Sequence, residues 1–294
     1  MIRWFAVINP TAGRRGLPVA HLREIADRYE LDVTFVASSS IADAVKAVTR
    51  AVADGFTHFV SVGGDGTAHV LINTLLPLQG SQRFALAVVA SGSGSDLVRT
   101  FGHSRSIEEA FQRLIFPDRY PIDVGVIVLD EQRTYFLNAA NVGVAAASAA
   151  VAVHLPRFLG GLRYIIAFWI ALARYRSRAV TVTVDRHQFR GRAINVVVAN
   201  GQFFGGGMNI AARASMADGL FDIQVFMGPK RQAFTVMPRV LRGTHLTHHS
   251  VQRYVGKEIA VSGKADVLVE ADGELIGRGG PTINVLPRAI DLVI

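Results

Sequence analysis

The chain of 294 residues contains no cysteine and no long uninterrupted apolar segment. The lack of cysteine excludes disulfide bonds and thiolate metal sites, and it is typical of proteins from a reducing compartment. The longest apolar run, residues 164–173, has ten residues, whereas a transmembrane helix needs about 20. Residues 1–5 also lack the apolar core and cleavage site of a secretory signal. We therefore expect a cytoplasmic protein that associates with membranes only peripherally.

Signatures of several common function classes are missing as well. There is no G-x-x-x-x-G-K-[ST] segment, which excludes a P-loop nucleotidase. The His-Arg-Asp loop of protein kinases and the G-x-S-x-G turn of serine hydrolases are also absent. His245, His248 and His249 cluster, but without further ligands at zinc spacing. No aromatic residues alternate with basic ones in the manner of a nucleic-acid platform, so we expect no nucleic-acid partner.

The positive charge is confined to one half of the chain. The net charge is +8, residues 1–125 hold 12 basic and 12 acidic side chains, and residues 126–294 hold 19 and 11. A basic half beside a neutral half predicts contact with something anionic, such as a membrane surface. The alternative is that the excess reflects an arginine-rich composition alone.

The first part of the chain alternates predicted strands with predicted helices. This alternation is typical of a parallel sheet covered by helices on both faces, so we expect an α/β nucleotide-binding domain over residues 1–124. The predicted strands are 3–8, 32–36, 58–62 and 84–89, and the predicted helices are 18–29, 41–53, a helix after Thr67 and a short one after Asp96.

The second part reads mostly as strands separated by turn signals. We expect a β-rich, largely antiparallel, sandwich-like domain over residues 125–294, with one helical insertion at 161–176. The last strand could pack back on the first domain. The predicted strands are 124–129, 134–141, 179–184, 193–199, 220–226, 258–262, 266–270 and 282–286.

Three loops rich in small residues follow the ends of predicted strands, at 9–16, 63–67 and 91–96. Ligands of parallel α/β sheets bind at the carboxyl ends of the strands. Glycines in the turn 63–67 allow close approach to an anion, and the following helix directs N–H groups towards it. Asp65 would repel a phosphate, so it fits a role in holding a cation or a hydroxyl. The alternative is a tight turn with an aspartate cap.

Carboxylates lie beside these loops and also far downstream. Phosphoryl transfer needs a cation to neutralise phosphate oxygens and a base for the attacking hydroxyl, and carboxylates can serve both purposes. For Asp272 and Gly273 the alternative is an ordinary hairpin turn. The carboxylates that we single out are Asp65, Asp96, Asp123, Asp272 and Glu274.

Taken together, these motifs resemble the diacylglycerol kinase catalytic-domain family, which includes bacterial lipid kinases and sphingosine kinases. The match runs along essentially the whole chain, and Gly63 to Thr67 reproduces the Gly-Gly-Asp-Gly-Thr signature in full. The other matching segments are Ile8-Asn9-Pro10 with Gly13, Gly92 to Asp96, Asn200-Gly201, Gly205 to Gly207, Asp218-Gly219-Leu220 with Asp222, and Asp272-Gly273-Glu274.

The resemblance implies an ATP- and Mg²⁺-dependent kinase with a phosphofructokinase- or NAD kinase-like first domain. It implies that Asp272 is the general base for a hydroxyl of diacylglycerol or a related membrane lipid, with Glu274 and Asp65 also in the catalytic group. Magnesium would be held near Asp65, Asp96 and Asp123, with a structural cation at Asp218. The implied ATP-binding residues are Asn9, Pro10, Gly13, Gly63, Gly64, Asp65, Gly66, Thr67, Gly92, Ser93 and Asp96.

The chain departs from the family pattern at a few positions. Ser93 replaces the usual Thr and keeps its hydroxyl, whereas Ser95 replaces the usual Asn and loses an amide. Ala212 stands where the family often has Pro. Ala217 stands where many members have Asp, which weakens the expectation of a cation at Asp218. These changes leave open a paralogue that binds lipid or nucleotide without turnover.

The expected partners are a membrane lipid and an anionic membrane surface, and a homodimer is left open. The segment 162–173, with Arg163 inside it, either rests on the membrane or forms a buried core helix. A soluble kinase of the NAD kinase type is the alternative function, because it shares the Gly-Gly-Asp-Gly core. The sequence does not identify the lipid.

Overall fold

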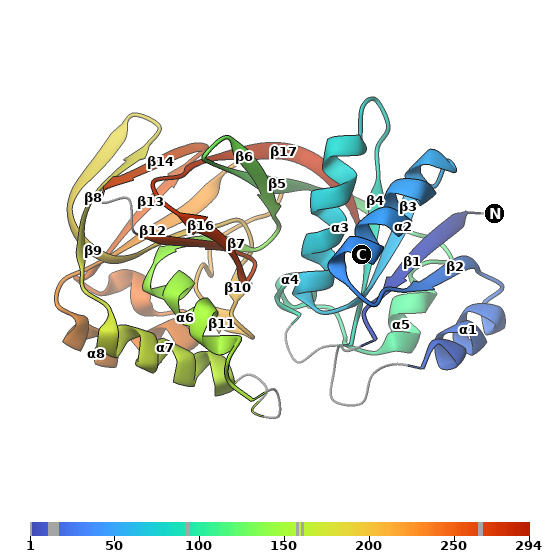
Figure 1. Ribbon diagram of the computed structural model, residues 1–294, viewed down its shortest axis with the longest axis horizontal. Coiled ribbons are helices and arrows are strands. Elements are labelled where there is room, and N and C mark those ends of the chain that lie inside the picture. The colour runs from blue at the N-terminus through green and yellow to red at the C-terminus, as the bar shows by residue number, and fades with distance from the viewer. Residues whose placement is uncertain (1, 11–17, 92–94, 157–158, 160–161, 264–266) are drawn as a thin grey trace. The chain divides into compact units, whose positions relative to one another are not determined.

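The computed structural model describes residues 2–10, 18–91, 95–156, 159, 162–263 and 267–294. The chain forms two compact units (Figure 1). The first comprises Met1–Ile122 together with Arg288–Ile294, and the second comprises Asp123–Pro287. Within the described residues no helix is long and apolar enough to cross a bilayer.

The first unit contains a parallel sheet in the strand order β2-β1-β3-β4. The central strand His58–Gly63 is buried along its whole length, because both faces of the sheet are covered. The predicted α/β class of this part is therefore confirmed. The strands are β1 (Arg3–Ile8), β2 (Asp32–Ala37), β3 (His58–Gly63) and β4 (Ala85–Ala90).

Helices cover the two faces of this sheet (Figure 1). Leu22 and Ile25 of α1 and Phe111 of α5 pack on the face that carries Trp4 and Val60. Strand side chains alternate between faces, and the other face is covered by α2 and α3, which pack against each other. The helices are α1 (Val19–Arg28), α2 (Ile41–Ala53), α3 (Asp65–Leu78), α4 (Asp96–Thr100) and α5 (Ile107–Gln112).

The start of α2 shows how local sequence sets an element. The Ser40 hydroxyl accepts the backbone N–H of Asp43 at 3.1 Å, so one of the unpaired N–H groups of the first turn is satisfied. Ala44, Val48 and Ala51 then fall on the buried face at helical spacing. Gly55, with a φ of +85°, follows the end of the helix.

The second unit is built from antiparallel strands, which confirms the β-rich class. The long strand β9 pairs with β8, β7 and β12. The strands not yet named are β5 (Arg119–Leu129), β6 (Gln132–Phe136), β7 (Ala139–Gly143), β8 (Arg178–Val184), β9 (His187–Ala199), β10 (Phe203–Phe204), β11 (Met208–Asn209), β12 (Phe221–Met227), β13 (Val251–Gly256), β14 (Glu258–Gly263), β15 (Leu268–Ala271), β16 (Glu274–Arg278) and β17 (Thr282–Val293).

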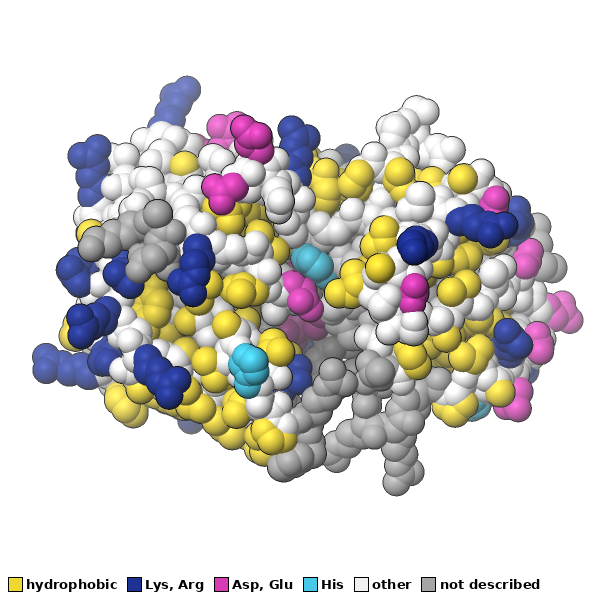
Figure 2. Space-filling view, in the orientation of Figure 1, with side chains coloured by type: hydrophobic (Ala, Val, Ile, Leu, Met, Phe, Trp, Pro, Cys, Tyr) yellow, Lys and Arg dark blue, Asp and Glu magenta, His cyan; other side chains and the backbone are white. Residues whose placement is uncertain are grey.

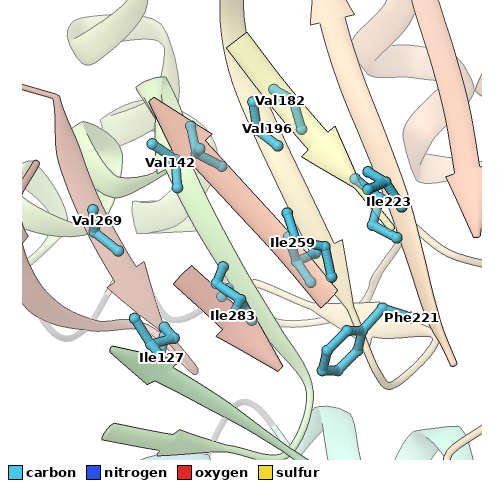
Figure 3. Close-up of a cluster of buried hydrophobic side chains, with 14 of the residues drawn as sticks. Ile127, Val142, Val182, Val196, Phe221, Ile223, Ile259, Val269 and Ile283 are labelled. Atoms are coloured by element: carbon cyan, nitrogen blue, oxygen red, sulfur yellow. The ribbon is translucent and has the colours of Figure 1, made fainter. Parts of the chain in front are cut away.

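The core of this unit consists mainly of β-branched side chains from facing strands (Figure 3). Val182, Val196, Ile223 and Ile259 are almost completely inaccessible to solvent, and Phe221 stacks on Phe136 with ring centroids 5.7 Å apart. Valine and isoleucine suit a pleated, buried surface. The alternation of apolar and polar residues in β8 therefore reflects which face of the strand is buried.

Among the described residues of this unit there are three α-helices rather than the single insertion predicted. They are α6 (Val144–Ala152), α7 (Leu162–Arg174) and α8 (Ala233–Leu241). The predicted insertion corresponds to α7. The prediction missed α6 because its alanine-rich sequence has no apolar period, and it missed α8 because Pro238 lies inside the helix.

The predicted strand 134–141 is in fact two strands, β6 and β7. The strand is interrupted at Leu137 and Asn138, because their backbone N–H groups donate to the side chain of Asp272 rather than to a neighbouring strand. The residues on either side were correctly predicted as strand. The interruption was missed because its cause, the side chain of Asp272, lies 134 or more residues away in the chain.

The final strand, β17, takes part in both units. Its first residues pair antiparallel with β14 in the second unit. Asp291 and Leu292 pair in parallel with Ala85 and Leu86 of β4 in the first unit. The ion pair between Arg83 and Asp291, at 2.6 Å, fixes that end of the strand.

Candidate active site

The glycine turn joins β3 to α3 at the carboxyl edge of the parallel sheet. Gly63 is the last residue of β3 and Asp65 is the first residue of α3. A Cβ atom on Gly63 would lie 2.2 Å from the hydroxyl oxygen of Thr67. Only glycine therefore lets the strand end so close to the first turn of the helix. The predicted strand, glycine turn and helix lie where the sequence places them.

Asp65 connects this turn to the next loop of the sheet. Its carboxylate accepts the backbone N–H of Asp96 through both oxygens, each at 3.1 Å, and that of Leu97 at 3.4 Å. The first backbone N–H groups of α4 are thus capped by a side chain of α3. The Ser95 side chain, at the N-cap position, makes no cap hydrogen bond. Both alternatives for Asp65 therefore remain compatible with its position, because a capping carboxylate can also face a cation.

Two buried hydroxyls at this edge have no hydrogen-bond partner among the residues that the structure describes. They belong to Thr67 and Ser95, which are 8% and 1% exposed. A buried hydroxyl without a partner is uncommon, since leaving it unsatisfied costs about 1–3 kcal/mol. Both therefore have donor and acceptor capacity for a polar ligand.

The first loop is described only in part. The backbone N–H of Asn9 donates to Val62 at the end of β3, at 3.0 Å, which holds the start of the loop beside the glycine turn. Pro10 follows and is exposed. The predicted nucleotide contacts Gly13, Gly92 and Ser93 lie outside the described residues.

Asp272 occupies the two-residue turn between β15 and β16. Asp272 and Gly273 have φ angles of +50° and +90°, and Ala271 pairs with Glu274 across the turn. Positive φ at both central positions is typical of an Asp-Gly hairpin. Glu274 is exposed at the start of β16.

The side chain of Asp272 does more than form this turn. Its carboxylate accepts the backbone N–H groups of Leu137 and Asn138, each at 2.8 Å, and that of Ala139 at 3.3 Å. Three N–H donors from one segment fix the orientation of both oxygens. Asp272 remains partly exposed, so the structure presents a fixed, solvent-accessible carboxylate.

A buried polar network supports this turn, and the sequence did not reveal it. The carboxylate of Glu270 accepts the backbone N–H of Gly273 at 2.8 Å and the side-chain amide of Asn141. Asn141 in turn accepts from Asn195, whose side chain accepts the N–H of Ala145 at the start of α6. The only available signal was polar residues within apolar strands, which marks them as buried and paired.

Asp123 and Asp218 both lie in the second unit and bind backbone groups of one loop. The completely buried Asp123 accepts the N–H of Gly219 at 2.7 Å. The exposed Asp218 accepts the N–H of Leu220 at 3.0 Å. Asn200, also completely buried, donates to the carbonyl oxygens of Asp123 and Leu137. Both aspartates therefore hold the backbone of the loop that contains Gly219 and Leu220.

The carboxylates at the glycine turn are oxygen donors of the kind that magnesium prefers. No group of three or more His, Asp or Glu side chains that could hold a metal occurs among the described residues. Magnesium is nevertheless usually bound by one or two carboxylates together with waters and substrate phosphates. Asp65 and Asp96 are the carboxylates at this turn: the side chain of Asp65 accepts the backbone N–H of Asp96, and the side chain of Asp96 lies 3.6 Å from the guanidinium of Arg99.

Comparison with known proteins gives a match for each part of the chain. Residues 3–127 match the diacylglycerol kinase catalytic domain. Residues 138–294, more than half of the chain, match the YegS C-terminal NAD kinase beta sandwich-like domain.

Individual relatives match along nearly the full length. The chain is 27% identical to a diacylglycerol kinase of Bacillus subtilis, with 98% of this chain and 95% of that protein covered. It is 27% identical to a probable lipid kinase YegS-like of Shewanella frigidimarina, with 86% and 81% covered. A crystal structure of a putative diacylglycerol kinase from Bacillus anthracis superposes with a TM-score of 0.80 at 22% identity, covering 99% and 96%, which shows the same fold.

Proposed function

Because the chain belongs to the family that joins a diacylglycerol kinase catalytic domain to a YegS C-terminal domain, we propose that it is an ATP- and Mg²⁺-dependent lipid kinase. It transfers the terminal phosphoryl group of ATP to a hydroxyl of diacylglycerol or a related membrane lipid. The relatives named diacylglycerol kinase and lipid kinase support this class of acceptor.

The first unit binds the phosphate donor in this proposal. The turn from Gly63 to Thr67 directs the N–H groups at the start of α3 towards the phosphates. The Thr67 hydroxyl, buried and without a partner in the described part of the chain, donates to the same ligand. Asp65 and Asp96 would hold Mg²⁺, which supplies positive charge against the phosphate oxygens when it is bound.

The second unit provides the base. The carboxylate of Asp272 accepts the proton of the lipid hydroxyl while the hydroxyl oxygen bonds to the terminal phosphorus of ATP; the bond from that phosphorus to its bridging oxygen breaks, and ADP leaves. Because Leu137, Asn138 and Ala139 hold its oxygens, the base is oriented before the acceptor arrives. Preorganisation of this kind removes part of the entropic barrier to the reaction. Glu274, two residues further on, contacts the acceptor in this proposal.

The observation that carries the proposal is the pairing of Asp65 with the N-terminus of α4 beside the glycine turn. It brings two carboxylates and two buried hydroxyls together at the carboxyl edge of a parallel sheet. Oxygen donors near a glycine turn are the groups that a magnesium-bound phosphate needs. The expected partners are a membrane lipid and an anionic membrane surface.

A single assay tests the proposal. The protein is incubated with labelled ATP and Mg²⁺, and with diacylglycerol, sphingosine, ceramide or NAD as the acceptor. We expect label in a lipid and none in NAD, and omission of Mg²⁺ should abolish transfer. Label in NAD alone would favour the soluble NAD kinase-like alternative. No label in any acceptor, together with retained ATP or lipid binding, would favour a non-catalytic paralogue.

A further inference from the structure

The helices α7 and α8 expose large apolar side chains in the second unit. On α7, Leu162 and Ile166 lie one turn apart and are 61% and 39% exposed. On α8, Phe234 and Leu241 are 67% and 49% exposed, with the exposed Pro238 between them. Residues at this spacing form one stripe along a helix. Each helix therefore carries an apolar stripe that its own unit does not cover.

These stripes are additional to the apolar faces that hold the helices in the fold. Val236, Met237 and Val240 of α8 are buried against the sheet, and Ala171 and Leu172 of α7 are buried against α6 and β9. The burial of those residues accounts for the attachment of both helices. The exposed residues Leu162, Ile166, Phe234 and Leu241 belong to neither of these buried clusters, so packing in the core does not explain their apolar character.

Direct contacts join the two stripes into one surface. The ring of Trp169 on α7 stacks on that of Phe234 on α8, with centroids 4.6 Å apart. Lys230, just before α8, donates to the carbonyl oxygen of Ala173 on α7 at 2.7 Å. We call the surface formed by Leu162, Ile166, Trp169, Phe234 and Leu241 the α7–α8 face.

The two chain segments that contain α7 and α8 carry charged side chains of only one sign. No Asp or Glu occurs between Glu131 and Asp185, or between Asp222 and Glu258, although these two segments together contain 12 of the 31 Lys and Arg residues. Within the described residues, no carboxylate forms an ion pair with the exposed basic side chains nearest the two helices. Those side chains are Arg174, Arg231, Arg239 and Arg242.

We propose that the α7–α8 face docks on a bilayer that contains anionic phospholipid. Figure 2 shows hydrophobic side chains gathered over α6 and α7 with Lys and Arg side chains around them. Apolar and aromatic side chains bordered only by cations are typical of helices that lie in a membrane interface. A protein partner would be expected to meet a mixed rim of charges.

Docking by this face rests on the proposed lipid kinase function, because a kinase must reach an acceptor that is dissolved in a bilayer. Docking itself requires no catalysis. The face can therefore be tested with vesicles alone, separately from phosphoryl transfer.

The test is sedimentation with phosphatidylcholine vesicles, with and without phosphatidylglycerol. One variant removes apolar side chains, Phe234→Ser with Leu241→Ser, and another removes charge, Arg239→Gln with Arg242→Gln. The matched controls are Phe116→Ser, at an 89% exposed phenylalanine of the first unit, and Arg186→Gln with Arg190→Gln, at exposed positions in β8–β9.

We expect the wild type and both controls to bind anionic vesicles and to bind neutral ones weakly. The charge variant should lose about fivefold in partitioning for each arginine removed, and the apolar variant at least tenfold. Equal binding by the wild type and both variants would overturn the proposal. So would equal binding of the wild type to neutral and anionic vesicles.

A fluorescence measurement provides a second readout that does not depend on sedimentation. The chain has two tryptophans, and Trp4 is fully buried in the first unit, so a blue shift on adding anionic vesicles would report Trp169. Absence of any shift would contradict docking by this face. Both variants should still phosphorylate lipid dispersed in detergent micelles. If the wild type labels no lipid yet the binding differences appear, the surface stands and the proposed kinase activity fails.

Discussion

The carboxylate of Asp65, in the first turn of α3, accepts the backbone N–H of Asp96 through both oxygens at 3.1 Å, across 31 residues of sequence. One side chain thereby fixes the start of α4 relative to the glycine turn. The first turns of α3 and α4, which follow different strands, are consequently held together. A ligand that contacts either turn will depend on this hydrogen bond.

Replacing Asp65 should separate its capping role from its charge. Asp65→Ala leaves the N–H groups of Asp96 and Leu97 without an acceptor, so the free energy of unfolding should fall by about 1–2 kcal/mol. Asp65→Asn keeps an acceptor oxygen and should recover most of that stability in urea unfolding. Phosphoryl transfer should stay low in both variants, because Asn lacks the charge for Mg²⁺. Wild-type activity in Asp65→Asn would assign the residue to capping alone.

Gly63→Ala should destabilise the glycine turn. The new methyl group would meet the Thr67 hydroxyl oxygen at 2.2 Å and its Cβ at 2.9 Å, and overpacking of this kind costs about 1–3 kcal/mol. We expect a lower midpoint in urea unfolding and weaker ATP binding by calorimetry. The double variant with Thr67→Ala removes the closest contact and should recover part of the stability but not the ATP affinity. Full stability in Gly63→Ala alone would contradict the close packing of the turn.

Asp272→Asn should reduce kcat by about 10²–10⁴-fold if Asp272 is the general base. Asp185 provides a matched control, because it also has a φ of +50° in a hairpin turn and accepts the backbone N–H groups of Lys257 and Glu258. Asp185→Asn should cost similar stability and leave kcat unchanged. Equal kcat values in the two variants would exclude Asp272 as the base and leave it the structural role that the hairpin alternative assigns.

Stability should fall as the pH drops below 6.5. Burial is the main cause that lowers the pKa of His58 and of His245 from their ordinary value of 6.5, and Arg119 lowers the pKa of His58 further. Folding therefore disfavours the protonated form of both histidines, and their contribution to stability is fully present above pH 6.5. This stabilisation is lost as the pH falls from 6.5 to the pKa of the histidine in the folded protein. The loss is at most about 1.4 kcal/mol per pH unit for each histidine.

Urea unfolding on both sides of pH 6.5 measures this loss. His58→Gln keeps an acceptor for Arg119, which lies 2.6 Å from His58 Nε2, and should flatten the pH dependence. His187→Gln, at an exposed position in β9, is the control and should leave it unchanged. The same slope in His58→Gln and in the wild type would show that His58 does not account for the loss.

The sequence was most informative where local patterns determine the structure. The strand from Arg3 to Ile8 and the helix after Ser40 appear at the predicted positions, because a buried strand and a capped helix leave their pattern within a few residues. The glycine turn 63–67 was placed by the same reasoning, since parallel strands all end at one edge of the sheet, whereas residues 11–16 and 92–94 of the other two loops lie outside the described residues.

The sequence was least informative where a side chain binds a distant backbone. The partners of Asp272 are N–H groups of residues 137–139, and a backbone N–H has no residue-specific signature. For the same reason the capping of α4 by Asp65, rather than by Ser95, could not be foreseen. The network of Glu270 and Asn141 was visible only as polar residues within strands, without their pairing.

The pairing of β17 with both β14 and β4 has a consequence for synthesis of the chain on the ribosome. The edge of β4 that receives Asp291 and Leu292 stays open while the whole second unit is being translated. The first unit consequently exposes an unpaired strand edge for most of its time as a nascent chain, which is a risk for aggregation. Premature termination a few residues before Asp291 would leave that edge permanently exposed, although every residue of the glycine turn and of the Asp272 hairpin would already have been made.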